Sequence, residues 1–381
     1  MKKLLPYALS LFCGIPILSQ AQAIRASLLP MQGALRVTND SLRRNYTNIT
    51  LEWQLLVNGI PKQKGTVPGI SLLPGQPRTI RLPLRPLTGG EEAFLKVGFR
   101  RPPQPGPPIA TQQLKWKTWG GDIAIPAAGD LSFTDSNDVF TVSSPTLRLS
   151  FDKQTGWIQQ YEVNHIPFLA DTNGLRPALQ EPPHFQLFST STGSQMVIVR
   201  TEYTLPGISC LLHLSYTVNA AGAMLVEQTL ETDTTRQDSL PHTIARFGMD
   251  WVLPPGADSL AWYGIAPEDL PDTLLPTLHH RYLPATFGQN PAAPIALLVR
   301  WWTLTDRAGR GFQLTADSNL LGHITATTPP IESRLRQLYP TSTQLQIDDT
   351  AWSRVLPAAH FFHYHYAFRT TPITPAPPAH R

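Results

Sequence analysis

The chain has 381 residues and a formal net charge of +4 at pH 7, and charged residues make up only 15% of it. Its lysines and arginines are scattered, which excludes the clustered basic footprint of a nucleic-acid-binding protein. Proline is unusually common, with 38 residues, about twice the usual share of about 5%. Because proline breaks helices, this composition predicts an all-β protein.

The first 23 residues have the pattern of a signal peptide. A basic start, Met1-Lys2-Lys3, precedes an apolar run from Leu4 to Leu18, and Ala21-Gln22-Ala23 forms a small-x-small cleavage site. The apolar run is too short and too interrupted by proline and glycine to span a membrane. We therefore expect an exported protein, periplasmic or extracellular, whose mature chain begins at Ile24.

Only two cysteines are present, and Cys13 lies in the predicted leader. The mature chain therefore has no intramolecular disulfide, although an oxidising compartment would permit one. The remaining cysteine, Cys210, lies within an apolar strand pattern, where a buried thiol is expected rather than a nucleophile.

Residues 24–125 read as about six or seven short strands separated by turn signals at roughly ten-residue intervals, the pattern of an immunoglobulin-like β-sandwich. Alternation from Ile49 to Val57 stops at Asn58-Gly59, a strong hairpin signal. The proline-rich run from Arg100 to Pro108 precedes one more strand, so we interpret it as a long hairpin loop. Residues 126–370 show longer strands without any long 3.6-residue stripe, which predicts a large β-sandwich. Residues 371–381 are expected to be a Pro-rich, frayed tail.

One stretch, Arg246 to Asp272, combines an apolar strand pattern with a polar loop. A second strand is expected from Leu260 to Tyr263, ending at Gly264. The loop after it carries Glu268, Asp269 and Asp272 beside Trp262 and Tyr263. Carboxylates at a strand end next to aromatic rings are typical of a sugar site. They are also what an ordinary solvated loop contains, and both interpretations stay open, with the residues alone favouring the ordinary loop.

Two further candidates lie near the end of the chain. Alternation from His360 to Phe368 places His363 and His365 on one face of a strand and Tyr364 and Tyr366 on the other. A metal site needs a third convergent ligand, and none is marked by spacing, so we expect a surface pair and no metal or cofactor. Trp352 follows Asp348-Asp349 in a polar segment, as a platform for a sugar ring or as a lid over the sandwich.

Several motifs resemble the C-terminal region of large bacterial β-galactosidases of glycoside hydrolase family 2. RFGM at 246–249, WYG with a Pro-Glu loop at 262–268 and DD-x-x-W at 348–352 are similar to the small-chain domain. GALRVTND at 33–40, LEWQLLVNG at 51–59 and FLKVGF at 94–99 look like the immunoglobulin-like domain before it. The resemblance implies an immunoglobulin-like sandwich followed by a galactose mutarotase-like supersandwich, and β-D-galactosides as the substrate class.

The chain departs from the family pattern at its site loops. The family loop G-R-G-P-x-E-N-Y reads Gly264-Ile265-Ala266-Pro267-Glu268-Asp269-Leu270, which loses its arginine, asparagine and tyrosine. By resemblance, Trp352 would stack on sugar, and Asp349 and Glu268 would bind substrate. The family's catalytic glutamates lie on a TIM barrel of about 250 residues, for which this sequence has no room. We therefore expect no catalytic residue in this chain.

Three functions follow as hypotheses. The chain is a β-galactosidase-related carbohydrate-binding protein for a galactoside or another glycan, inactive alone. Alternatively, it is a small subunit that completes the active site of a separate β-galactosidase barrel chain. The third hypothesis is a non-catalytic structural or interaction module without a sugar site.

Overall fold

The computed structural model describes residues 23–29, 33–84, 86–87, 91–101, 107–121, 123–170, 175–179, 181–233, 242–244, 247–254, 259–265, 276–282, 297–317, 343–348, 354–356 and 363–373. Within these ranges all elements are β-strands apart from one short 3-10 helix, η2 (Pro206–Ile208). The predicted all-β class is therefore confirmed. No helix in this part of the chain is long and apolar enough to cross a membrane. The signal peptide remains a prediction, because residues 1–22 lie outside the described residues.

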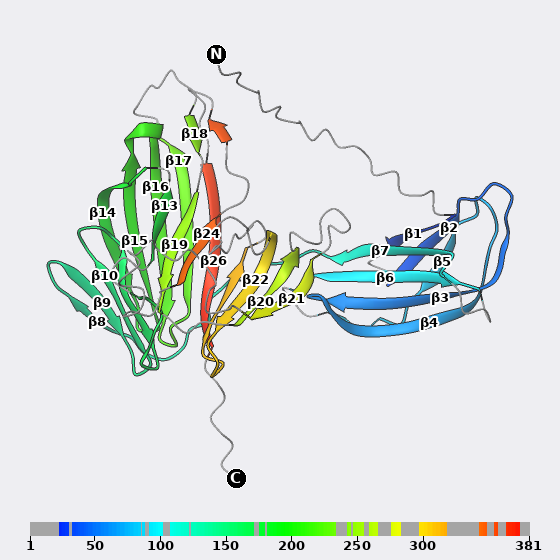
Figure 1. Cartoon of the computed structure of the whole chain (residues 1–381), viewed down its shortest axis with the longest axis horizontal. Coiled ribbons are helices and arrows are strands. Elements are labelled where there is room, and N and C mark those ends of the chain that lie inside the picture. The colour runs from blue at the N-terminus through cyan, green and yellow to red at the C-terminus, as the bar shows by residue number, and fades with distance from the viewer. Residues whose placement is uncertain are drawn as a thin grey trace, which may run out of the picture. The chain divides into compact units, whose positions relative to one another are not determined.

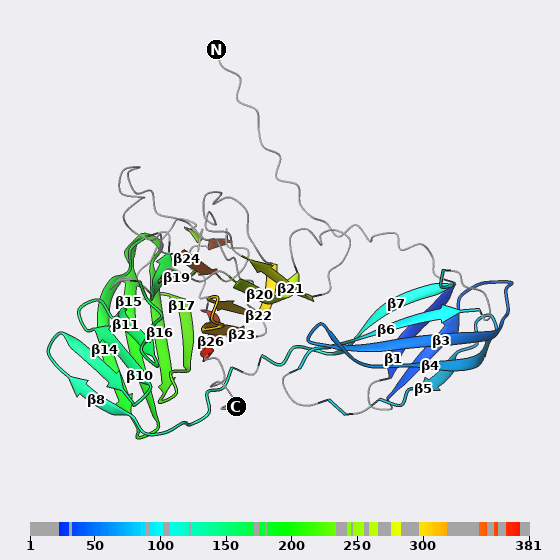
Figure 2. The ribbon, with the colours of Figure 1, turned by 60° about the horizontal axis from the view of Figure 1, so that its bottom comes forward.

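The chain forms two compact units, which divide between Thr118 and Trp119. We call the first the N-terminal sandwich and the second the C-terminal supersandwich. The N-terminal sandwich contains β1 (Ile24–Leu29), β2 (Ala34–Asn39), β3 (Tyr46–Val57), β4 (Ile60–Leu72), β5 (Arg78–Arg81), β6 (Ala93–Arg100) and β7 (Ala110–Lys117). One sheet has the order β1-β2-β5 and the other β4-β3-β6-β7, and Figure 2 shows the two layers. This is the predicted immunoglobulin-like arrangement.

Alternation along β3 explains how this sandwich closes. Leu51, Trp53, Leu55 and Val57 are buried at 5% exposure or less, so every second side chain enters the core. The predicted hairpin at Asn58-Gly59 is confirmed, with φ of 48° and 79°, the positive values that a tight hairpin turn of this kind requires.

Two expectations for this sandwich have different outcomes. The long hairpin around the proline-rich run is confirmed, because β6 and β7 pair antiparallel as neighbours. The sequence pattern predicts a strand here only from Ile70 to Leu73, and this extent is wrong, because β4 starts at Ile60 and pairs with most of β3. Prolines 61 and 68 hid this strand from the sequence pattern. They are tolerated because β4 lies at the edge of its sheet.

The C-terminal supersandwich contains two large antiparallel sheets (Figure 1). The eight-stranded sheet consists of β24 (Thr343–Asp348), β19 (Phe247–Leu253), β13 (Leu175–Leu179), β11 (Ile158–Val163), β10 (Leu147–Asp152), β9 (Val139–Ser143) and β8 (Ser132–Asp135), with β12 (Ile166–Pro167) beside β11. The nine-stranded sheet has the order β14 (His184–Thr192), β15 (Met196–Leu205), β16 (Cys210–Asn219), β17 (Met224–Thr232), β26 (His363–Ile373), β23 (Gly311–Ala316), β22 (Leu297–Thr305), β20 (Ser259–Ile265) and β21 (Thr277–Tyr282). A separate pair joins β18 (His242–Ile244) and β25 (Arg354–Leu356).

Large aromatic side chains fill the core between the two sheets. Trp251 of β19 is fully buried and stacks on Phe312 of β23, with ring centroids 4.5 Å apart. Its indole N–H donates to the carbonyl of Phe168 at 2.7 Å, which satisfies the polar atom inside the core. The RFGM strand therefore holds the two layers of the supersandwich together.

At the start of the supersandwich, residues 119–121 and 123–131 make hydrogen bonds to the nine-stranded sheet. The indole N–H of Trp119 donates to the carbonyl of Ala316 at 3.2 Å. The side chain of Arg369 donates to the carbonyl of Ala124 at 2.8 Å, and that of Asn219 to the carbonyl of Pro126 at 2.8 Å. The compact supersandwich thus includes residues that the sequence pattern assigned to the preceding domain.

Two strand ends differ from the sequence expectation. β20 continues past Gly264 to Ile265, with a register shift after Tyr263 where it pairs with β22. β26 continues to Ile373, because Gly311 to Gln313 of β23 pair with it there. Residues 371–373 therefore belong to the sheet rather than to a frayed tail.

Candidate site: a histidine and glutamate face of the supersandwich

The three site residues expected from the resemblance, Glu268, Asp349 and Trp352, all lie outside the described residues. The strands that flank them are described. β20, which precedes Glu268, belongs to the nine-stranded sheet, whereas β24, which precedes Asp349, belongs to the eight-stranded sheet. Their role in sugar binding therefore stays a prediction.

The structure adds partners to the histidines of the last strand. β26 pairs with β17, so that His363 lies opposite Glu231 and His365 lies opposite Thr229. The Nδ1 atom of His363 is 3.5 Å from Glu231 Oε2, and His365 Nε2 is 4.0 Å from Glu227 Oε1. The predicted surface pair is thus part of a larger polar arrangement.

This arrangement continues onto two more strands through His213 of β16. Its Nε2 atom is 3.1 Å from Glu231 Oε1, and its Nδ1 atom is 3.7 Å from Glu202 Oε1 on β15. Glu231 therefore contacts one histidine on each side. We call these six residues the His–Glu face: Glu202, His213, Glu227, Glu231, His363 and His365.

Strand period and register explain why these side chains share one face. Alternate residues of β15, β16, β17 and β26 point into the core, among them Tyr203, Leu214, Val226 and Phe368, each 1% exposed or less. The intervening residues must then point away from the core. Figure 1 shows β16, β17 and β26 as neighbouring strands of this sheet.

The side chains of the His–Glu face keep contact with water. His213 is 36% exposed, His363 55% and Glu231 28%. Even fully charged side-chain pairs at an exposed surface contribute only about 0–1 kcal/mol to stability. The face is therefore not explained as a stabilising device of the fold.

The side chains of the His–Glu face suit ligands that are rich in hydroxyl groups. Carboxylates accept hydrogen bonds, and an imidazole ring both donates and accepts, while a hydroxyl does both. His213 Nε2 and Glu231 Oε1 are within hydrogen-bond distance, at 3.1 Å. Among the described residues no group of three or more histidine, cysteine or acidic side chains has an arrangement that could hold a metal ion.

The other candidates from the sequence are part of the core. Cys210 is 1% exposed, as expected, and its thiol donates to the carbonyl of Ile208 at 3.0 Å. Burial raises the pKa of this thiol to about 12, and Glu181 and Asp233 act in the same direction. Because nucleophilic attack needs the thiolate, this cysteine does not carry nucleophilic chemistry near neutral pH.

None of the tryptophans in the described ranges is an exposed sugar platform. Trp53, Trp119, Trp251, Trp262 and Trp302 are buried at 9% exposure or less. Trp116, Trp157 and Trp301 are partly buried. Most tryptophans in this part of the chain therefore belong to the core.

The supersandwich also has a cavity of about 350 Å³, between the β11–β12 turn and the β22–β23 turn. His165, Phe168, Asp306 and Phe312 are among its lining residues. Asp306 is held by Arg310, through contacts of 2.8 Å to both Nε and Nη2. These contacts and the backbone N–H groups of Ala308 and Arg310 keep the pKa of Asp306 below its ordinary value, although partial burial opposes them. The Asp306 carboxylate therefore stabilises the β22–β23 turn.

Comparison with known families identifies both units. Residues 35–104 match the family described as β-galactosidase, domain 4. Residues 143–272 match the family described as β-galactosidase small chain. These are β-galactosidase domains. Two segments of the chain are therefore similar to β-galactosidase domains, with the domain 4 segment before the small-chain segment.

Other comparisons are more distant. A search of curated protein sequences finds no match. The structure of galactose 1-epimerase from Lactobacillus acidophilus is similar, with a TM-score of 0.35 and 9% identity over 65% of this chain and 98% of that chain. A glycoside hydrolase family 36 α-galactosidase from Geobacillus stearothermophilus gives a TM-score of 0.40 and 9% identity over 64% of this chain and 41% of that chain.

Sequence reasoning found two members of the His–Glu face and missed four. Glu202, His213, Glu227 and Glu231 each lie in an alternating strand, where a polar residue at every second position signals only a solvent-facing side. The four lie within the segment that matches the β-galactosidase small chain. Their association with His363 follows from the pairing of β17 with β26, two strands far apart in the sequence.

Proposed function

We propose that this protein is a carbohydrate-binding relative of glycoside hydrolase family 2 β-galactosidases that does not hydrolyse glycosides by itself. After export and removal of its leader, it would bind galactosides through the His–Glu face. The observation that carries this proposal concerns Glu231. Its carboxylate contacts imidazoles of two neighbouring strands on a solvent-exposed face of the C-terminal supersandwich. Such an alternating set of donors and acceptors complements neighbouring sugar hydroxyls.

Calorimetric titration of the full-length mature protein with lactose and galactose tests this proposal. Glu231→Gln removes a charged acceptor, so galactoside affinity should fall about tenfold, the equivalent of one charge-assisted hydrogen bond. The matched control is Glu162→Gln, because Glu162 also faces a histidine, His165, at 3.5 Å but lies away from the face. Absence of any galactoside binding, or equal affinities of the two variants, would contradict the proposal.

Two further measurements address the residues and activity expected from the resemblance. Trp352→Ala should weaken galactoside binding if that tryptophan stacks on the sugar, independently of Glu231. A chromogenic β-galactoside should not be turned over by the isolated protein. Measurable turnover would overturn the statement that this chain is inactive alone.

The match of residues 143–272 to the β-galactosidase small chain favours a second candidate, a subunit that completes the active site of a separate barrel chain. This role demands a co-purifying barrel protein whose β-galactosidase activity depends on the present chain. Loss of that activity on removal of this protein, and its return on addition, would establish the role. If the protein purifies without such a partner and binds galactosides, only the binding function is supported.

A further inference from the structure

A second candidate surface lies on the N-terminal sandwich, whereas the His–Glu face belongs to the C-terminal supersandwich. The solvent side of the sheet β4-β3-β6-β7 is hollowed into an open cavity of about 670 Å³, within the range of small-molecule sites. We call it the Gly98 groove. Its lining residues are Glu52, Trp53, Gln54, Lys64, Gly65, Thr66, Lys96, Val97, Gly98, Arg100, Pro108, Thr111, Gln112 and Gln113.

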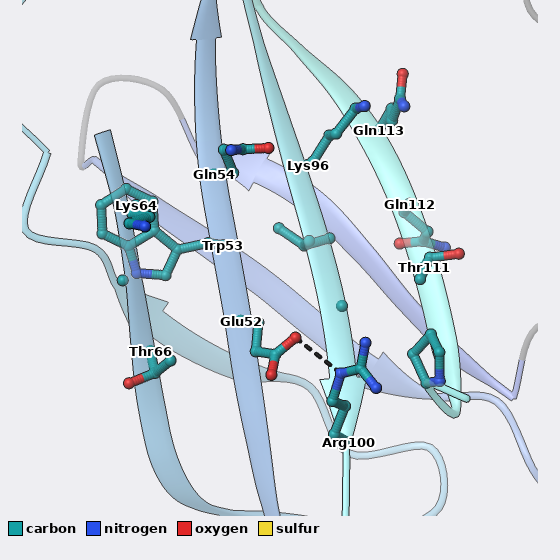
Figure 3. Close-up of a pocket in the computed structure, with 14 residues that line it drawn as sticks. Glu52, Trp53, Gln54, Lys64, Thr66, Lys96, Arg100, Thr111, Gln112 and Gln113 are labelled. Atoms are coloured by element: carbon teal, nitrogen blue, oxygen red, sulfur yellow. Dashed lines mark hydrogen bonds and ion pairs between the residues drawn. The ribbon is translucent and has the colours of Figure 1, made fainter. Parts of the chain in front are cut away.

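Strand register places the polar lining in two rows across the sheet. Lys64, Gln54, Lys96 and Gln113 form one row, and Thr66, Glu52, Gly98 and Thr111 form the next. Figure 3 shows Gln54 and Lys96 on neighbouring strands, and Glu52 joined to Arg100. The Glu52 Oε2 to Arg100 Nε distance is 2.8 Å. This contact holds the arginine over the sheet.

Gly98 forms the floor of this groove, and neither packing nor backbone conformation requires glycine there. A Cβ atom at this position would meet only Thr111 Cγ2 at 3.8 Å, an ordinary contact. Gly98 is also not among the positive-φ glycines. Glycine inside a strand weakens it and often marks a place where a ligand approaches the backbone. The groove therefore has a bare floor that a ligand can reach.

Gly65, in the adjacent strand β4, provides the contrast. A Cβ atom there would lie 2.7 Å from Trp53 Cζ2, so this glycine is required by the buried indole. Of the two glycines that line the groove, packing explains one and leaves Gly98 without a structural role. A site for a ligand supplies that role.

The charge of the lining decides which ligand fits. Lys96 and Arg100 lie two residues to either side of Gly98 on the same strand, about 7 Å away along it. With Lys64, three cationic side chains face one carboxylate, Glu52. Gln54, Gln113, Thr66 and Thr111 add amides and hydroxyls, which both donate and accept. This combination complements an acidic sugar, with its carboxylate between Lys96 and Arg100 and its hydroxyls on the amides.

A peptide fits this surface less well. Peptides that bind sheets usually add a strand at an edge, whereas the residues that line this groove belong to all four strands, so that it lies across the face of the sheet. We propose that the Gly98 groove binds an acidic oligosaccharide, with a uronate carboxylate held by Lys96 and Arg100 over Gly98.

Titration of the mature protein with trigalacturonic acid at low salt tests this proposal, with neutral maltotriose as the uncharged comparison. Binding of the acidic trisaccharide should be at least tenfold tighter and should weaken with added NaCl, because exposed charges are screened. Gly98→Val should weaken it at least tenfold by filling the floor. Lys96→Gln should weaken it about tenfold through the lost charge, and Arg36→Gln, on the other sheet, should change nothing.

Thermal unfolding separates a filled site from a damaged fold. Gly98→Val should not lower the unfolding temperature, because valine favours strands and its Cβ atom meets no close neighbour. Gly65→Val should lower it, since that side chain would displace Trp53. Equal affinity for the acidic and neutral sugars, or unchanged binding by Gly98→Val, would overturn the proposal. Equally tight binding of a short polyglutamate peptide would also overturn it, in favour of an acidic peptide ligand.

Discussion

Raising the pH from about 9 to 11 should progressively destabilise the C-terminal supersandwich through four buried groups. Tyr161, Tyr203, Tyr216 and Cys210 are each 1% exposed or less. Burial raises the pKa of all three phenols above the ordinary value of about 10 and that of the thiol to about 12. In the unfolded chain these groups titrate at their ordinary values.

The sign of the effect follows from proton binding. Below about pH 8 both states keep their protons, and the raised pKa values change nothing. Above that, the unfolded chain releases protons that the folded supersandwich retains, so the free energy of unfolding falls as the pH rises. At pH 11 the loss is about 1.4 kcal/mol for each phenol and about 3 kcal/mol for the thiol. The total of about 7 kcal/mol is comparable with the whole stability of many domains.

Two phenylalanine variants make this prediction specific. Tyr203 donates its hydroxyl to the carbonyl of Thr155 at 2.9 Å, so Tyr203→Phe should cost about 1 kcal/mol at pH 7. The buried hydroxyl of Tyr216 has no hydrogen-bond partner within the described part of the chain, so Tyr216→Phe should stabilise by about 1 kcal/mol at pH 7. At pH 11 each variant should lose about 1.4 kcal/mol less than the wild-type protein.

Urea titrations at pH 7 and pH 11, followed by tryptophan fluorescence, measure these differences. The transition of the supersandwich is the one that shifts in Tyr216→Phe at pH 7. Absorbance of tyrosinate against pH gives an independent check, because the buried phenols should ionise only as this unit unfolds. A rise in tyrosinate from all tyrosines near pH 10 without unfolding, or equal alkaline losses in the three proteins, would refute the reasoning.

Two further predictions concern the same unit. Gly156 has φ of 74°, and a Cβ atom there would lie 2.5 Å from the Tyr203 hydroxyl oxygen, so Gly156→Ala should destabilise the supersandwich by about 1–3 kcal/mol; an unchanged urea midpoint would contradict this. Native Cys210 should resist iodoacetamide at pH 8 and react after unfolding in urea, because a thiol with a pKa of about 12 is almost entirely protonated there; mass spectrometry detects the adduct, and rapid native labelling would show that the thiol is accessible.

The site shows where prediction from the sequence stops. His363 and His365 were assigned to one strand face because the side-chain period of a strand is two. Glu231 and His213 lie on strands with the same period, but periodicity does not reveal which strands are neighbours. β26 pairs with β17 on one side and with β23 on the other, and both pairings join segments remote in the chain. A histidine pair therefore became a six-residue face only through long-range pairing.

Gly98 illustrates the same limit for the N-terminal sandwich. In the sequence it is one glycine in an alternating strand, and nothing there shows whether its neighbours leave room for a side chain. Their difference depends on the neighbouring strand, since the Trp53 indole lies against Gly65 and only a threonine methyl group lies near Gly98. The space around a glycine depends on tertiary packing, which the sequence pattern does not show.

The resemblance to β-galactosidase domains rests on short motifs such as RFGM at 246–249. The sequence by itself also determined the all-β class, the two successive sandwiches and the hairpin at Asn58-Gly59. These follow from local signals, namely proline content, two-residue alternation and turn residues, which act within a few neighbouring positions. Only the tertiary structure decided that β4 is a long edge strand, that β26 reaches Ile373, and which polar side chains meet on the His–Glu face. Those depend on pairing between distant segments, because hydrogen bonds of a sheet join whatever strands the core brings together.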